Sequence, residues 1–238
     1  MPRRVPNILS LDLDWFNWID INDHGSRTRG KEVKKQMIMD FFAHLHLRCT
    51  LPPTVAFMTE HHYFYPWCAE LMRSLKAKRV NVYNVDEHHD FYYIREIDDF
   101  KTHLISCANF FAFMAHRGMI NSYHWVLGDE RLSFHTKALK RELRETYSRS
   151  VRDLGQRCQV SSVKQVWEVL DRKKFDGVAI VKSLDYTADQ DVVFPTVNTV
   201  MRRYFTPIHG VKVGRSLCRA DYKPKERPSL NMSNLLPV

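Results

Sequence analysis

The sequence is poor in cysteine and glycine and has no long apolar run. Its 238 residues include five cysteines and eight glycines. The cysteines are odd in number and include no Cys-x-x-Cys pair, so reduced thiols are predicted rather than a disulfide framework or a thiolate metal site. The apolar run near the N-terminus reaches the charged Asp12 too soon for a signal peptide or a membrane span. These absences predict a cytoplasmic protein with no membrane contact.

Negative charge is also scarce relative to positive charge. Lysine and arginine number 36 against 27 acidic residues, which gives a formal net charge of +9. Such an excess favours an acidic partner, whether a peptide, a nucleic acid or a membrane surface, although a solvated basic surface explains it equally well. The sequence contains no recognisable RNA-binding motif, so nucleic acid is the less favoured partner.

Short apolar segments alternate with segments of helical periodicity along most of the chain. Strands are predicted over residues 7–13, 54–58, 79–85, 122–127 and 177–181, and helices over residues 31–48, 63–77, 98–117, 136–153, 163–173 and 190–205. This alternation predicts an α/β fold with a three-layer, doubly wound and mostly parallel sheet. We expect one domain over residues 1–220 and an extended C-terminal tail over residues 221–238, where periodicity is lost.

The most informative stretch is Asp-Glu-His-His-Asp at residues 86–90, directly after a mostly apolar run. In an extended strand, residues two apart point the same way, so Asp86, His88 and Asp90 are predicted to project together. Carboxylate and imidazole groups suit Mn²⁺, Fe²⁺ or Zn²⁺. Because three such groups would be costly to bring together without a cation, the stretch predicts a metal site.

Polar residues also follow the other predicted strands. In doubly wound sheets, ligands bind at the carboxyl ends of the strands. The strand ends together supply four carboxylates and two imidazoles, the ligand inventory of a two-metal hydrolase: Asp12, Asp14, His61, Asp86, His88 and Asp90. Two divalent cations and a bridging hydroxide would leave a charge of about −1, which favours a cationic substrate such as a guanidinium group.

Two other interpretations stay open. A haloacid-dehalogenase-like, Mg²⁺-dependent phosphatase would use Asp12 as nucleophile and Asp14 as acid/base. However, Phe16 stands where that motif normally has threonine or valine, and residues 86–90 would have no role. A non-catalytic basic module that binds nucleic acid is the other interpretation. Metal content would separate the three: two manganese ions per chain, one magnesium ion, or none.

Three of these motifs resemble the pattern of the arginase and deacetylase metal hydrolases: Glu60-His61, the Asp-x-His-x-Asp of residues 86–90 and the Ser-x-Asp-x-Asp of residues 10–14. The chain is most similar to an arginase-like family of formerly unknown function that includes the peptide arginases of ribosomal natural-product biosynthesis. The similarity covers residues 7–190 in patches, including residues 181–187. In arginases the Ser-x-Asp-x-Asp strand follows the other two, whereas here it opens the chain, which implies a permuted strand order.

The resemblance implies a Mn²⁺-dependent hydrolase that converts arginine side chains of a precursor peptide to ornithine and releases urea. It also implies two Mn²⁺ ions bridged by hydroxide, with Asp12 and Asp86 binding both. The first ion would be bound by Asp12, His61, Asp86 and Asp90, and the second by Asp12, Asp14, Asp86 and His88.

The residues that contact substrate are less specified by the resemblance. Asp185 lies about where arginases keep a carboxylate that binds guanidinium, which gives it a catalytic and substrate-binding role; a helix cap is the alternative. Asn109 resembles a polar, substrate-binding position of the family, although it is equally explained as a satisfied core asparagine. The aromatic run at residues 91–93 replaces the Ser/Asn-rich segment of free-arginine arginases and favours a longer, peptide ligand, although aromatic residues can equally belong to the core.

The remaining histidines receive weaker assignments. His62 and His89 neighbour the predicted ligands but point the opposite way in an extended strand, so packing roles are expected. A proton shuttle could be His103 or His124, and the spacing selects neither.

Overall fold

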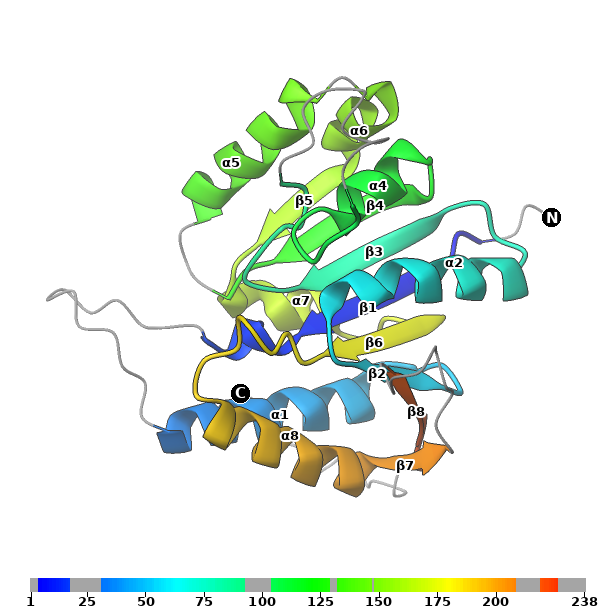
Figure 1. Cartoon of the computed structure of the whole chain (residues 1–238). Helices are drawn as coiled ribbons and strands as arrows, with labels where there is room; N and C mark the ends of the chain where they lie inside the picture. Colours follow the sequence, from blue (N-terminus) through cyan, green and yellow to red (C-terminus); the bar gives the residue numbers. More distant parts are fainter. Residues whose placement is uncertain are drawn as a thin grey trace, which may run out of the picture.

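In the computed structural model an eight-stranded sheet runs through the middle of the molecule (Figure 1). The structure describes residues 4–17, 31–92, 104–128, 132–146, 148–208 and 219–226. The strands lie in the order β5-β4-β3-β1-β6-β2-β8-β7. Their bounds are β1 Asn7–Asp12, β2 Val55–Met58, β3 Val80–Val85, β4 Ile120–Val126, β5 Cys158–Ser161, β6 Gly177–Val181, β7 Phe205–Ile208 and β8 Arg219–Pro224.

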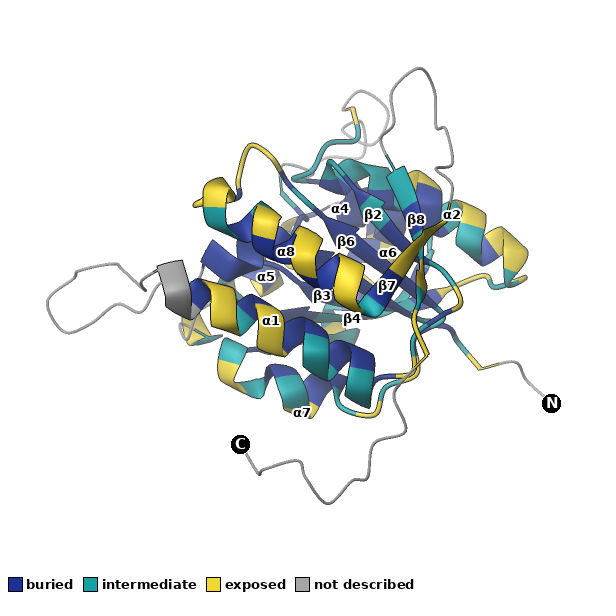
Figure 2. Ribbon diagram, turned by 90° about the horizontal axis from the view of Figure 1, so that it is seen from below, coloured by how far each residue is buried: buried dark blue, intermediate teal, exposed yellow. Residues whose placement is uncertain are grey.

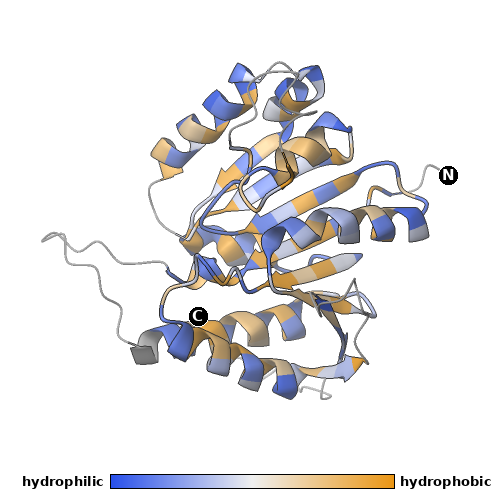
Figure 3. Cartoon of the chain, viewed as in Figure 1, coloured by the Kyte–Doolittle hydropathy of each residue, from blue (hydrophilic) through white to orange (hydrophobic). Residues whose placement is uncertain are grey.

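The sheet is parallel from β5 to β2 and antiparallel at one end. β8 pairs antiparallel with β2, and β7 pairs antiparallel with β8. All five residues of β6 are buried, which is typical of a parallel strand covered on both faces. Figure 3 shows the same feature as hydrophobic colour along the central strands.

Helices cover both faces of the sheet and make three layers. One face carries α2 Phe64–Ser74, α4 Phe110–His116, α5 Leu132–Glu145 and α6 Arg149–Leu154. The other face carries α1 Lys31–Arg48, α7 Val166–Leu170 and α8 Gln190–Tyr204. Buried and exposed residues alternate along α1 and α8 in Figure 2, because each helix turns one side to the sheet and the other to solvent. The α/β class and the mostly parallel sheet predicted from the sequence are thereby confirmed.

Several predicted element bounds are wrong. The helix predicted over residues 136–153 is two helices, α5 and α6, because the backbone is extended at Ser148. The helix predicted over residues 163–173 is a 3-10 turn, Val163–Gln165, followed by the short α7. Part of the helix predicted over residues 98–117 lies outside the described residues, and α4 begins only at Phe110.

The tail predicted from residue 221 begins too early. Residues up to Pro224 belong to β8, where Asp221 pairs with Arg219 at 2.7 Å within the strand. The rest of the predicted tail from residue 227 lies outside the described residues. β8 obtains its hydrogen-bond partners from β2 and β7, which lie far from one another in sequence, so local periodicity carries no sign of it.

Four neighbouring strands end at the same edge of the sheet. In the order β3-β1-β6-β2 all four run parallel, and Leu11 pairs with Val85 while Asp12 and Met58 both align with Val181. The residues that follow these strands therefore emerge side by side, as ligand sites in such sheets do. Within the described part of the chain, no helix is long and apolar enough to cross a bilayer.

His124 on β4 provides a test of how β4 packs against β5. Its Nε2 lies 2.9 Å from the Ser161 hydroxyl of β5, and burial together with the charge of Lys173 lowers its pKa to about 4. The folded state thus favours the neutral ring, while the unfolded chain takes up a proton below about pH 6.5. The stability that the neutral His124 ring gives the folded state is therefore complete above about pH 6.5 and is lost as the pH falls toward 4.

We therefore expect His124→Gln to lose less stability on acidification than the wild-type protein. Between pH 7 and pH 5 the fall in the free energy of unfolding should be smaller by about 1 kcal/mol, a value reduced to allow for partial solvent exposure. Urea denaturation at the two pH values measures the difference. An equal fall in both proteins would show that the ring is not buried in its neutral form.

Candidate metal centre

Six acidic and imidazole side chains meet where the four central strands end. Asp12 is the last residue of β1, and Asp14 lies in the 3-10 turn η1, Leu13–Asn17, that follows. His61 opens the 3-10 turn η2, His61–Tyr63, after β2. Residues 86–90 follow β3 directly. Five of the six are buried, with His88 partly exposed, so the cluster is built into the sheet edge rather than displayed on the surface.

The first group converges on one nitrogen of His61. Nδ1 lies 2.9 Å from Asp12 Oδ2, 3.1 Å from Asp90 Oδ2 and 3.3 Å from Asp86 Oδ2. On the other side of the ring, Nε2 lies 2.7 Å from the Ser10 hydroxyl, which fixes how the imidazole faces. A ring nitrogen carries at most one proton and cannot serve three carboxylates, whereas a cation among them could.

The second group forms around His88. Its Nδ1 lies 3.1 Å from Asp14 Oδ2 and 4.0 Å from Asp86 Oδ1. Asp86 therefore belongs to both groups, since Oδ2 faces His61 and Oδ1 faces His88. Ligand atoms of Asp12, His61 and Asp86 lie within 4.8 Å of one another, as do those of Asp14, Asp86 and His88. A shared carboxylate between two such sets is the geometry that can hold two metal ions.

The cluster holds more negative charge than its burial tolerates. Burial and the neighbouring carboxylates raise the pKa of Asp86 to about 7 and the pKa of Asp14 well above its usual value. A hydrogen bond with Asp14 raises the pKa of His88 to about 10. For His61, burial lowers the pKa, but the charges of Asp90 and Asp12 outweigh it and raise the pKa well above 6.5. Without cations, these groups would have to retain protons.

Asp90 supplies a second sign that a cation fits. Its Oδ2 is buried and accepts no hydrogen bond, although it lies 3.1 Å from His61 Nδ1. Buried carboxylate oxygens without a partner are rare and costly. The donor set, four carboxylates and two imidazoles, suits a divalent metal of the Mn²⁺ type.

Neighbouring polar groups hold the carboxylates in place. Asn84 donates from Nδ2 to Asp86 Oδ2 at 3.1 Å, and the Trp125 indole donates to the Asp86 carbonyl at 2.9 Å. The Ser183 hydroxyl, which follows β6, donates to Asp12 Oδ2. The backbone amide of His88 donates to Asp86 Oδ1 at 2.8 Å. These contacts orient Asp12 and Asp86 independently of a bound metal.

Sequence reasoning assigned no role to Ser10, Asn84 or Ser183. Ser10 precedes Asp12 by two residues, and Asn84 precedes Asp86 by two, so both point to the same side of their strands as the predicted ligands. The rule that residues two apart on a strand point the same way, applied to the residues before Asp12 and Asp86, would have found Ser10 and Asn84. Ser183 has a φ of 46°, in the left-handed region, and the sequence around it does not predict this conformation.

The two predicted substrate residues do not line the cavity. Asn109 is buried, and its amide holds the turn before α4 by accepting from the Ser106 amide at 2.8 Å and donating to the Leu104 carbonyl at 3.2 Å. It therefore matches the alternative of a satisfied core asparagine. Asp185 is exposed. Burial raises the pKa of Glu60, and the negative charge of Asp185 is the next largest cause of that rise. Along the chain Asp185 lies between Ser183 and Tyr186, which both line the cavity.

The other histidines occupy packing positions or lie elsewhere. The His89 ring stacks on Tyr92 with centroids 4.0 Å apart, and His62 lies 4.2 Å from the Tyr63 ring. His124 contacts β5 and does not line the cavity. His103 lies outside the described residues. The described contacts of His124 therefore give it no role as a proton shuttle.

A cavity of about 370 Å³ opens above the cluster. The six metal-capable side chains and Ser183 form its base, and Tyr92, Cys107, Ala108 and Tyr186 complete the lining. Among the described residues that line it, none is lysine or arginine. A cavity with this lining favours a positively charged ligand.

No protein-family model, curated protein or solved structure matches this chain.

Proposed function

We propose that the protein is a Mn²⁺-dependent hydrolase that converts arginine side chains of a peptide to ornithine and releases urea. The observation that carries the proposal is the pair of Asp/His groups that share Asp86 at the base of a cavity with no basic side chain in its described lining. A guanidinium group is a planar cation, and it complements such a cavity in charge.

The residues divide between the two metals as the distances suggest. Asp12, His61, Asp86 and Asp90 would hold the first ion. Asp14, Asp86 and His88 would hold the second, with Asp12 adjacent because its Oδ1 accepts the Asp14 amide at 3.1 Å. When bound, the two ions supply a water of lowered pKa and positive charge that stabilises the tetrahedral transition state.

The chain's own residues would bind and orient the guanidinium group. The Tyr186 ring lies 5.9 Å from the His88 ring and is 51% exposed, so one of its faces is available beside the cavity. Such a face attracts a flat cation. Glu60 and Asp185 directly precede His61 and Tyr186, which line the cavity, and would offer carboxylates to the remaining N–H groups. The oxygen of water adds to the guanidinium carbon, and the bond from that carbon to Nε breaks. A proton from the water passes to Nε, which stays on the side chain as the amine of ornithine, and the carbon leaves as urea.

Exposed apolar side chains close in sequence to the cavity lining favour a peptide over a free amino acid. Leu104 is 87% exposed and Leu184 is 39% exposed, and each lies within a few residues of the cavity lining along the chain. Exposed apolar groups near a site are typical of contact with a larger ligand.

The phosphatase interpretation has less support. Asp12 would have to act as a free nucleophile, yet its Oδ2 lies 2.9 Å from His61 Nδ1 and accepts the Ser183 hydroxyl. That interpretation also leaves Asp90 without a role. A nucleic-acid module leaves the whole cluster unexplained.

The decisive assay is incubation of the Mn²⁺-loaded protein with arginine-containing peptides and with free arginine. We expect urea and a loss of about 42 Da from the peptide, the mass of the group removed when arginine becomes ornithine. The metal-free protein is the control. Absence of urea from every substrate at full metal occupancy would exclude this function.

Replacement of Tyr186 tests the substrate side of the proposal. Tyr186→Ala should raise KM for an arginine peptide by roughly 5- to 10-fold and change kcat less than about threefold, because the ring would bind substrate and transition state alike. Tyr186→Phe keeps the aromatic face and should stay close to wild type. Steady-state urea release measures both variants, and an unchanged KM in the alanine variant would remove Tyr186 from the substrate site.

A further inference from the structure

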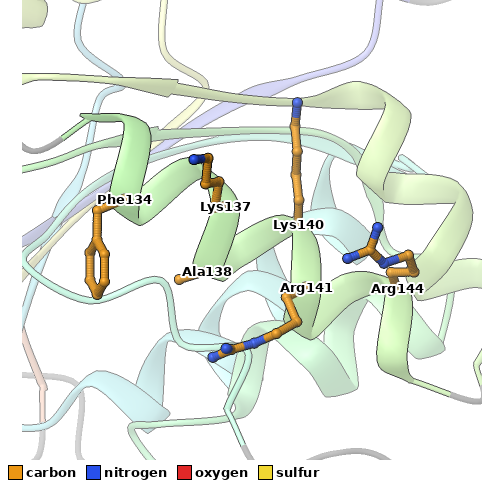
Figure 4. Close-up of a pocket in the computed structure, with 6 residues that line it drawn as sticks. All are labelled: Phe134, Lys137, Ala138, Lys140, Arg141 and Arg144. Atoms are coloured by element: carbon orange, nitrogen blue, oxygen red, sulfur yellow. The ribbon is translucent and has the colours of Figure 1, made fainter.

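Helix α5 carries four basic side chains on one side, which we call the α5 basic face: Lys137, Lys140, Arg141 and Arg144. Figure 4 shows them along successive turns of the helix, with Phe134 at one end. All four are exposed, whereas Leu139 and Leu143 on the opposite side are buried. Their spacing of i, i+3, i+4 and i+7 keeps the four charges within about 100° of arc.

The α5 basic face is largely unneutralised. Like charges three and four residues apart repel one another and disfavour the helix, so the arrangement is not explained by helix stability. Among the described residues, the one ion pair of these side chains joins Arg141 to Glu142 at 3.9 Å. A row of uncompensated cations attracts an anionic ligand.

The first turn of α5 packs on the strand next to the one that leads to Asp86. The Phe134 ring lies 5.3 Å from the His135 ring, and the His135 ring lies 5.6 Å from the Trp125 ring on β4, which pairs with β3. The Trp125 indole donates to the Asp86 carbonyl at 2.9 Å. The α5 basic face follows this first turn along the helix.

The two neighbouring surfaces have opposite charge. The cavity is lined by carboxylates and takes a cation, while the α5 basic face takes an anion. We propose that the α5 basic face binds an acidic segment of the same peptide whose arginine enters the cavity. This inference rests on the proposed function for the identity of the cationic residue, and it adds the part of the substrate that would set specificity.

Other anionic partners match the surface less well. A nucleic acid is anionic along its whole length, so the adjoining carboxylate cavity would repel it. A membrane surface needs an apolar helix side to insert, and on α5 the leucines are buried in the core. Phe134, 64% exposed, is the exception at one end of the helix and can contact an apolar residue of a peptide.

Binding can be measured without turnover. A fluorescent peptide with four glutamates and one arginine is titrated with the Mn²⁺-loaded full chain, and a peptide with glutamines in place of the glutamates is the reference. In Lys137→Glu/Arg141→Glu, Kd for the acidic peptide should rise at least about tenfold, and added salt should weaken wild-type binding. The control is Lys78→Glu/Arg79→Glu, which changes the net charge by the same amount. These residues directly precede β3, at the opposite edge of the sheet, so this variant should alter Kd less than about twofold.

Several results would overturn the inference. One is an equal Kd for the acidic peptide in Lys137→Glu/Arg141→Glu and in the wild-type protein. Another is wild-type binding of the glutamine peptide as tight as that of the acidic peptide. The third is tighter wild-type binding of single-stranded DNA or anionic vesicles than of the acidic peptide. Lys137→Gln/Arg141→Gln, which adds no negative charge to the helix, should show an intermediate loss. Circular dichroism of each variant separates lost binding from lost folding.

Turnover separates this inference from the proposed function. If urea is released, Lys137→Glu/Arg141→Glu should show a KM for the acidic peptide at least about tenfold higher than that of the wild-type protein, with an unchanged kcat. Its KM for the glutamine peptide should also be unchanged. If no peptide yields urea, the proposed function fails, and the binding comparison still decides whether the α5 basic face holds an acidic segment.

Discussion

Asp86→Asn should remove both metal ions and lower urea release by at least about 1,000-fold. Asp86 has one carboxylate oxygen 3.3 Å from His61 Nδ1 and the other 4.0 Å from His88 Nδ1, so its negative charge serves both groups. Asparagine keeps the size of the side chain but removes its charge. Metal analysis of the purified variant after Mn²⁺ loading and dialysis measures the ions per chain, and steady-state urea release measures the activity.

A surface variant provides the matched control for this prediction. Asp153→Asn removes one carboxylate from α6, where Asp153 is 61% exposed and pairs with Arg149 at 3.8 Å. It should keep two ions per chain and wild-type turnover. If Asp86→Asn also retained two ions and full activity, Asp86 would not be the shared ligand.

Metal removal should lower the melting temperature of the wild-type protein substantially. A ligand at about 1,000 times its Kd stabilises the folded state by about 4 kcal/mol, which for a chain of this size corresponds to a shift of roughly 8–16 °C. The metal-free protein also retains the repulsion among four buried carboxylates. Differential scanning calorimetry with Mn²⁺ and after chelation measures the shift.

Asp90→Asn should change stability in opposite directions in the two states. Without metal, loss of one carboxylate from the group around His61 should raise the free energy of unfolding by about 1 kcal/mol relative to wild type. With Mn²⁺, the variant should lose most of the metal-dependent gain. Asp90 has a φ of 53°, a conformation that asparagine also adopts readily, so the backbone adds no strain.

This reversal distinguishes a metal site from a structural ion-pair network. If Asp90 mainly stabilised the fold by pairing with His61, its replacement would destabilise the metal-free protein as well. A lower melting temperature for metal-free Asp90→Asn than for metal-free wild type would therefore contradict the metal assignment.

The six metal-capable residues could be selected from the sequence because parallel neighbouring strands bring their carboxyl ends together. The structure places all six around one cavity. The strand alternation expected for Asp86, His88 and Asp90, and for Asp12 and Asp14, does not continue that far, because β3 ends at Val85 and Asp14 lies in a 3-10 turn. The rule that holds depends only on the class of the fold, which the chain's periodicity already indicates.

Single polar residues outside such patterns could not be placed. Nothing near Asn109 in sequence shows that its amide is used by the turn at residues 104–106, because that turn depends on how the segment meets α4. Asp185 shares a motif with Ser183, yet the left-handed φ of Ser183 decides that the hydroxyl, and not the later carboxylate, faces Asp12.

The missed strands have a related cause. β5, β7 and β8 have four to six residues and lie toward the two ends of the sheet that the described residues form. Such strands carry little alternation, and pairing with distant residues stabilises them. The edge pairing of β8 with β2 therefore appears only in three dimensions.

Anomalous diffraction at the manganese absorption edge, from crystals of the Mn²⁺-loaded protein, tests the two-metal site most directly. We expect two peaks: one among Asp12, His61, Asp86 and Asp90, and one among Asp14, Asp86 and His88. A single peak, or full occupancy at a place away from Asp86, would contradict the two-metal centre and the hydrolase proposed from it.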